Sequence, residues 1–84
     1  MATVLITGCS SGIGLETALA FARRGDRVHA SMRNTAKAED LRTRARAEGL
    51  DIGIVALDVT DDASVTTAVR AVEDRDGALD VLVN

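Results

Sequence analysis

Four short apolar segments alternate with three longer segments of helical periodicity along this 84-residue chain. The apolar segments are residues 3–6, 28–32, 52–57 and 79–83. Continuous apolar runs of this length are typical of strands that are buried on both faces of a sheet. Because helices of about ten or more residues connect them, we expect parallel strands joined by right-handed crossovers. The sequence therefore predicts an α/β fold, β-α-β-α-β-α-β, which is the N-terminal half of a doubly wound parallel sheet with strand order 3-2-1-4.

Start and stop signals bound the three helical segments. Each begins at or after a residue that suits a helix start: Gly12, then Asn34 or Thr35, then one of Thr60, Asp61 and Asp62. Each ends at a glycine that suits a helix C-terminus: Gly25, Gly49 and Gly77. The middle helix is mostly charged, and we expect it to be exposed, with Ala38, Leu41 and Ala45 sharing one face.

Composition narrows the classes of function. Hydrophobic residues make up 46% of the chain, yet Phe21 is the only aromatic, so we expect an aliphatic core. A net charge of -3 offers no basic surface to a phosphate backbone, which disfavours nucleic acid and favours a small ligand. Cys9 is the only cysteine, so no disulfide, thiolate metal site or other metal site is expected. Without a basic, apolar leader or an apolar stretch of about 18 residues, we expect a cytoplasmic protein with no membrane partner.

A glycine or polar residue follows each predicted strand. These are Gly8, Arg33 after Met32, Asp58, and Asn84. Because the carboxyl ends of parallel strands meet at one edge of a sheet, we expect these residues to lie together. Ligands of doubly wound sheets bind at that edge, and the sequence therefore predicts a ligand site there.

The stretch TGCSSGIG, residues 7–14, leaves the first strand with almost no side chains. Gly8 lets the chain reverse tightly, Gly12 leaves room for the backbone to approach a phosphate, and Gly14 lets the next helix pack near the sheet. Backbone N–H groups at the helix start favour an anion, and Ser10 and Ser11 can add hydroxyl donors. We predict a pyrophosphate site, and a glycine turn without a ligand is the alternative.

Two rival motifs fit this turn less well. A P-loop requires a glycine followed by lysine where the chain has Ile13 and Gly14. GCSSG does match the G-x-S-x-G nucleophile elbow, with Ser10 as nucleophile. The order Ser, Asp, His is not met, however, because the only histidine, His29, precedes both Asp58 and Asp80. A serine hydrolase built on Ser10 is thus a weak alternative.

Other chemistry-bearing side chains are interpreted as structural. Cys9 occupies a position for a small residue rather than a redox site. His29 is expected to be a packed or edge side chain of its strand, and Gly53 a weak or closely packed point of the next strand. The charged residues before Gly77 are expected to form a solvated helix end: Glu73, Asp74, Arg75 and Asp76.

Three motifs in order resemble the short-chain dehydrogenase/reductase family. They are T-G-x-x-x-G-I-G at residues 7–14, LDVTD at 57–61 and LDVLVN at 79–84, which resembles the start of that family's L-V-N-N-A-G motif. The stretches VLITGCSSGIGL and MRN are most similar to the hydroxysteroid and retinol dehydrogenases of the family. The resemblance covers the whole chain. It implies that residues 1–84 are the N-terminal portion of one dinucleotide-binding (Rossmann) domain, whose remainder is absent from this chain.

The resemblance also implies roles for single residues. Asp58 corresponds to an aspartate that accepts from the adenine amino group, with Val59 beside the ring, although Asp58 as a cap of the next helix is the alternative. Asn84 corresponds to the first asparagine of the family motif. The expected cofactor-binding set is Gly8, Ser10, Ser11, Gly12, Ile13, Gly14, Arg33, Asp58, Val59 and Asn84.

The end of the second strand indicates which nicotinamide nucleotide fits. About 20 residues past the glycine turn, an NAD enzyme usually places an acid on the ribose 2′-hydroxyl. This chain has Met32 and then Arg33 there, and a guanidinium can bind a 2′-phosphate that an acid would repel. We therefore expect NADP(H) in preference to NAD(H). Ser11 stands where many NADP-linked relatives carry a basic residue, so Arg33 is the only cation expected to bind the 2′-phosphate. The alternative is that Arg33 is a solvated surface charge.

Catalytic residues are not expected within these 84 residues. The family mechanism uses a tyrosine acid/base, a lysine and a serine, all downstream of the asparagine motif. This chain has no tyrosine, and its only lysine is Lys37 in the charged second helix. By resemblance the full-length protein is an NADP-dependent oxidoreductase of an alcohol or ketone substrate and a homo-oligomer. A non-catalytic NADP(H)-sensing protein of the same fold is the alternative.

Overall fold

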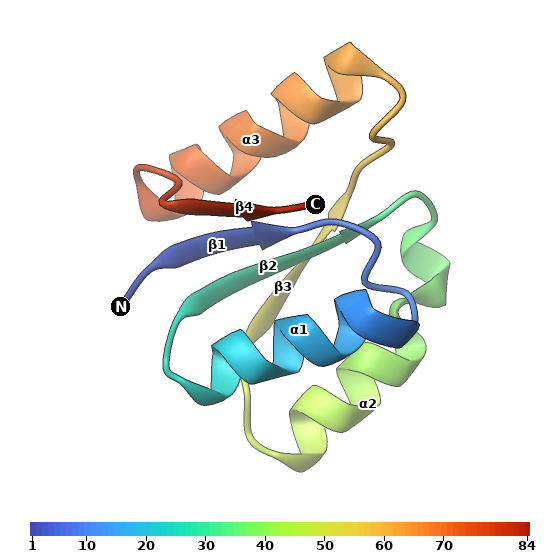
Figure 1. Cartoon of the computed structure of the whole chain (residues 1–84), viewed down its shortest axis with the longest axis vertical. Coiled ribbons are helices and arrows are strands. Elements are labelled where there is room, and N and C mark those ends of the chain that lie inside the picture. The colour runs from blue at the N-terminus through green and yellow to red at the C-terminus, as the bar shows by residue number, and fades with distance from the viewer.

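The four strands form one parallel sheet in the order β3-β2-β1-β4 in the computed structural model, which describes all 84 residues (Figure 1). The strands are β1 (Thr3–Ile6), β2 (Arg27–Met32), β3 (Ile52–Ala56) and β4 (Val81–Val83). The helices are α1 (Gly12–Arg23), α2 (Glu39–Ala47) and α3 (Asp62–Asp76), and a 3₁₀ turn, η1 (Thr35–Ala38), precedes α2. The predicted fold class and strand order are confirmed.

Helices cover both faces of the sheet: α1 and α2 lie on one face and α3 lies on the other (Figure 1). The central strand β1 is buried throughout, and its side chains enter two separate cores. Val4 and Ile6 pack with α1 and α2, whereas Leu5 packs with Ala68 and Val72 of α3. Burial on both faces explains why β1 is a continuous apolar run and not an alternating one.

Strand boundaries depart from the predicted ones by one or two residues where hydrogen bonds to neighbouring backbone intervene. β2 begins at Arg27, whose N–H donates to the Ala2 carbonyl (2.8 Å). β4 begins at Val81 because Asp80 is bonded twice to Thr3. The Asp80 N–H donates to the Thr3 carbonyl (2.9 Å), and Asp80 Oδ2 accepts from the Thr3 N–H (2.8 Å). β3 ends at Ala56, and Leu57 turns into the core under α3.

The second predicted helix is split into η1 and α2. Asn34 caps η1, because its Oδ1 accepts from the Ala36 N–H (3.0 Å). Asp61 caps α3, since its Oδ1 accepts from the N–H groups of Ala63 (3.0 Å) and Ser64 (3.4 Å). The two caps that the sequence left open are therefore Asn34 and Asp61. None of the helices combines the length and the apolar character that crossing a membrane requires.

Candidate nucleotide-binding site

The loops that leave β1, β2 and β3 meet around one cleft of about 690 Å³. Its lining residues are Thr7, Gly8 and Ser10 after β1, Met32, Arg33, Asn34 and Lys37 from the end of β2 to η1, and Leu57, Asp58 and Val59 after β3. Gly8, Arg33 and Asp58 therefore gather at the carboxyl edge of the sheet, as parallel strands require. A cleft of this volume has the size of small-molecule sites in proteins.

The three glycine positions of the first turn require glycine for different structural reasons. Gly8 has φ +67° and Gly12 has φ +60°, a backbone region that favours glycine, and a Cβ on either would meet nothing within 4 Å. A Cβ on Gly14, by contrast, would lie 2.1 Å from the carbonyl oxygen of Gly8. The first turn of α1 is thus packed directly against the end of β1, while the backbone at Gly8 and Gly12 stays open.

The start of α1 carries no negative charge of its own. The first turn of α1 has no acidic residue, whereas α2 has Glu39 and Asp40 there and α3 has Asp62. Ser11 precedes α1 in an extended conformation, and its hydroxyl makes no capping hydrogen bond. The free N–H groups and the positive end of the α1 dipole are therefore uncompensated and favour an anion.

Arg33 and Asp58 lie side by side in the cleft. Arg33 Nε is 3.9 Å from Asp58 Oδ2, and the Arg33 side chain is 80% exposed. Asp58 Oδ1 accepts from the Thr60 hydroxyl (2.7 Å) and the Thr60 N–H (3.0 Å). These two hydrogen bonds, with the smaller effect of the Arg33 charge, hold the pKa of Asp58 below its ordinary value, so Asp58 is an ionised acceptor. The alternative that Asp58 caps α3 is wrong, because Asp61 does so.

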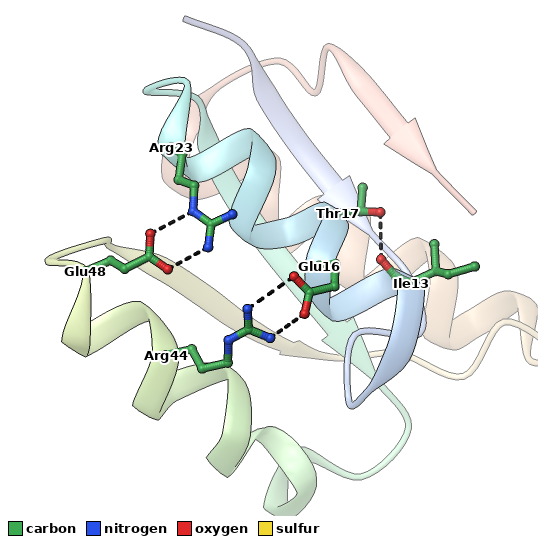
Figure 2. Close-up of polar contacts among 6 residues, drawn as sticks. All are labelled: Ile13, Glu16, Thr17, Arg23, Arg44 and Glu48. Carbon is green, nitrogen blue, oxygen red and sulfur yellow. Dashed lines mark hydrogen bonds and ion pairs between the residues drawn. The ribbon is translucent and has the colours of Figure 1, made fainter.

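Other residues of the expected set lie beside the cleft. Ser11, Gly12 and Ile13 line a second groove of about 760 Å³ between α1 and α2. Ile13 is 87% exposed and extends away from the ion pairs that join these helices (Figure 2). Asn84 lies on the other side of β1, where the Thr7 hydroxyl donates to its Oδ1 (2.9 Å). The expected residues thus follow one edge of the sheet from β4 to β3.

Lys37 lines the cleft although the sequence placed it on an exposed charged helix. The turn η1 holds Lys37 close to the end of β2, because the Asn34 carbonyl accepts from the Lys37 N–H (3.0 Å). The spacing of three residues from a capping asparagine was the available signal.

His29 and Asp76 form a pair at the opposite end of the sheet, next to Asp26 and Asp51, which precede β2 and β3. His29 is buried, and its Nε2 lies 2.5 Å from Asp76 Oδ2. A Cβ on Gly53 would lie 3.0 Å from His29 Nδ1, so Gly53 is a closely packed point. The prediction that Asp76 is solvated is wrong, because the histidine of β2 reaches it. Within these 84 residues, the only histidine therefore lies away from Ser10.

Cys9 belongs to the core. Its side chain is buried, and its Sγ lies 3.2 Å from the Ile6 carbonyl oxygen. Burial raises the pKa of the Cys9 thiol, which disfavours the reactive thiolate. The geometry agrees with a structural role.

A doubly wound sheet with a bare glycine turn before its first helix defines a Rossmann-type α/β protein. The model of the short chain dehydrogenase family matches residues 2–84, and the chain belongs to this family.

Named relatives agree with this assignment. The chain is 39% identical over 83 residues to gluconate 5-dehydrogenase of Gluconobacter oxydans and 43% identical over 86 residues to human retinol dehydrogenase 8. These matches cover 99% and 98% of this chain but 32% and 27% of those proteins. The crystal structure of glucose dehydrogenase from Caenorhabditis elegans matches with a TM-score of 0.90 at 36% identity, over 99% of this chain and 36% of that one. The chain spans about a third of the length of the curated relatives it matches.

Proposed function

We propose that this chain is the NADP(H)-binding portion of an oxidoreductase that transfers a hydride between a nicotinamide cofactor and an alcohol or carbonyl substrate. The observation that carries the proposal is the gathering of Gly8, Arg33 and Asp58 in one cleft at the carboxyl edge of the sheet. Ligands of doubly wound sheets bind at this edge. The dehydrogenases among the relatives support hydride transfer as the reaction.

The turn after β1 fits a diphosphate. The backbone is open at Gly8 and Gly12, the first turn of α1 has no carboxylate, and the Ser11 hydroxyl is not used by the helix. Main-chain N–H groups at the start of α1 then bind the diphosphate without needing a cation. A side chain at Gly8 or Gly12 would occupy the space through which the diphosphate approaches.

The residues after β2 and β3 fit the adenosine end of the dinucleotide. The ionised Asp58 carboxylate is an acceptor for the adenine amino group, and Val59, 51% exposed, offers an apolar surface to the base. Arg33 is exposed and only loosely paired with Asp58. Its planar guanidinium suits a 2′-phosphate, and no acid stands at the end of β2 to repel that phosphate.

The residues of this chain bind and orient the dinucleotide, and the bound nicotinamide supplies or accepts the hydride. We assign proton transfer to and from the substrate to residues outside this chain, because the 84 residues include no tyrosine. In this proposal, residues 1–84 are the N-terminal portion of a single dinucleotide-binding domain.

The role of Arg33 is tested by Arg33→Asp in the full-length protein. We expect the affinity for NADPH to fall about tenfold or more, because the new carboxylate repels the 2′-phosphate. The affinity for NADH, which has no 2′-phosphate, should stay the same or increase. The measurement is the Kd of each nucleotide by fluorescence titration. Arg42→Asp is the matched control, since Arg42 is exposed on α2 and does not line the cleft. An unchanged ratio of the two Kd values in Arg33→Asp would remove Arg33 from this role.

The reaction class is tested by NADPH oxidation with a panel of ketones and aldehydes. Turnover of members of the panel by the full-length protein supports the oxidoreductase. Tight NADPH binding without turnover of any of them would instead favour a nucleotide-sensing protein of the same fold.

A further inference from the structure

The cleft contains a second cation besides Arg33. Lys37 lines it together with Arg33, Asn34 and Asp58. The Lys37 side chain is exposed and forms no ion pair with any carboxylate of the chain. Asp58 is the only acidic residue among those that line the cleft. Positive charge is therefore in excess there, although the whole chain has a net charge of -3.

The turn η1 fixes the position of Lys37 relative to Arg33. The Asn34 side chain accepts from the Ala36 N–H (3.0 Å), and the Asn34 carbonyl accepts from the Lys37 N–H (3.0 Å). Ala38, the next residue, is fully buried in the core and anchors the turn. The Lys37 backbone is therefore held by Asn34, the residue next to Arg33, and Lys37 lies four residues after Arg33 in the sequence.

Two neighbouring cations repel each other, and an anion that contacts both removes this repulsion. A dianionic phosphate suits the pair, because arginine binds it through two N–H groups in a plane and lysine binds it as a mobile point charge. We propose that Lys37 is the second cation of the 2′-phosphate site and, with Arg33, determines the preference for NADP(H) over NAD(H). This inference rests on the proposed function, and it assigns a specificity-determining residue outside the expected set.

The test is Lys37→Met in the full-length protein. We expect binding of NADPH and of 2′,5′-ADP to weaken about tenfold, the loss of one charge-assisted contact, while binding of NADH and 5′-AMP stays within about twofold. Lys37→Arg keeps the charge and should recover most of the affinity for the two phosphorylated probes. Arg42→Met is the matched control, because it removes one positive charge from an exposed position outside the cleft. Unchanged NADH binding also reports that the variant is folded.

The outcomes separate this inference from the proposed function. Equal changes for NADPH and NADH in Lys37→Met, or no change for either, would overturn the role of Lys37 alone, provided that Arg33→Asp still alters the ratio of Kd values. If the wild-type protein binds NADPH no more tightly than NADH, and Arg33→Asp leaves the ratio unchanged, the proposed preference for NADP(H) fails and the role of Lys37 fails with it.

Discussion

Gly14 is the residue at which the site tolerates the least change. A Cβ at Gly14 would lie 2.1 Å from the Gly8 carbonyl oxygen and 3.1 Å from that of Thr7, and both are backbone atoms that cannot rotate away. Because α1 must then move off the end of β1, we expect Gly14→Ala to lower the free energy of unfolding by about 2–4 kcal/mol. Urea denaturation of the full-length protein measures this loss.

Gly49→Ala is the control for Gly14→Ala. Gly49 has φ +69°, but a Cβ there meets open space, so only backbone strain of about 1 kcal/mol is expected. Equal losses in the two variants would contradict the close packing of α1 against β1.

At the scale of residues, the sequence predicted the site residues that follow the strands, and it missed one residue placed by a local turn and one contact between distant segments. Gly8, Arg33 and Asp58 were predicted because each lies within two residues of the end of a strand, and parallel strands end at one edge. Lys37 was missed because its place depends on a 3₁₀ turn that helical periodicity does not indicate. Asp76 was misassigned because its partner, His29, is 47 residues away in sequence.

Two ion pairs of opposite polarity connect α1 with α2 (Figure 2). Arg23 of α1 binds Glu48, just beyond α2, through two contacts of 2.7 Å. Glu16 of α1 binds Arg44 of α2, also through two contacts. We expect Glu16→Arg and Arg44→Glu each to lower Tm, because each single reversal places like charges together. The double variant should recover most of the loss, since it restores the pair in reverse.

A double-mutant cycle on thermal unfolding of the full-length protein measures this coupling. Arg42→Glu serves as control, because it reverses a charge on α2 that takes part in no ion pair. Strictly additive effects of Glu16→Arg and Arg44→Glu would show that the two side chains do not stabilise the helix pair.

At the scale of elements, local hydrogen bonds account for the differences from the predicted boundaries. The sequence predicted every strand and helix because their apolar periodicity repeats over several residues. The predicted start of β4, Leu79, is two residues early. Leu79 is apolar and continues the strand pattern, but in the structure Asp80 is hydrogen-bonded to Thr3 and β4 begins after it. The division of the second helix at Ala38 follows from the Asn34 cap and is likewise a local geometric effect.

Across the whole molecule, the topology was predictable because alternation of strands and helices admits few arrangements of a parallel sheet. Electrostatic contacts between distant segments were not predictable. Four carboxyl groups have pKa values below the ordinary range because a donor holds the ionised form: Arg44 for Glu16, Arg23 for Glu48, Thr60 for Asp58 and His29 for Asp76. Three of these donors lie on segments distant in sequence, whereas Thr60 lies two residues from Asp58 in the same loop.

These lowered pKa values predict that acid destabilises the fold. The unfolded chain binds more protons than the folded chain below the ordinary carboxyl pKa of about 4. The stability that these groups contribute is therefore complete above that pH and is lost as the pH falls through their lower folded pKa values.

Asp76→Asn removes one such group. We expect it to lower the urea midpoint at about pH 6, where His29 loses its charged partner, and to make the decline toward about pH 3 shallower than in the wild-type protein. Asp74→Asn, at an exposed residue of the same helix without an ion pair, should leave the wild-type decline unchanged. An Asp76→Asn profile parallel to that of the wild type would mean that the contact between β2 and α3 contributes no pH-dependent stability.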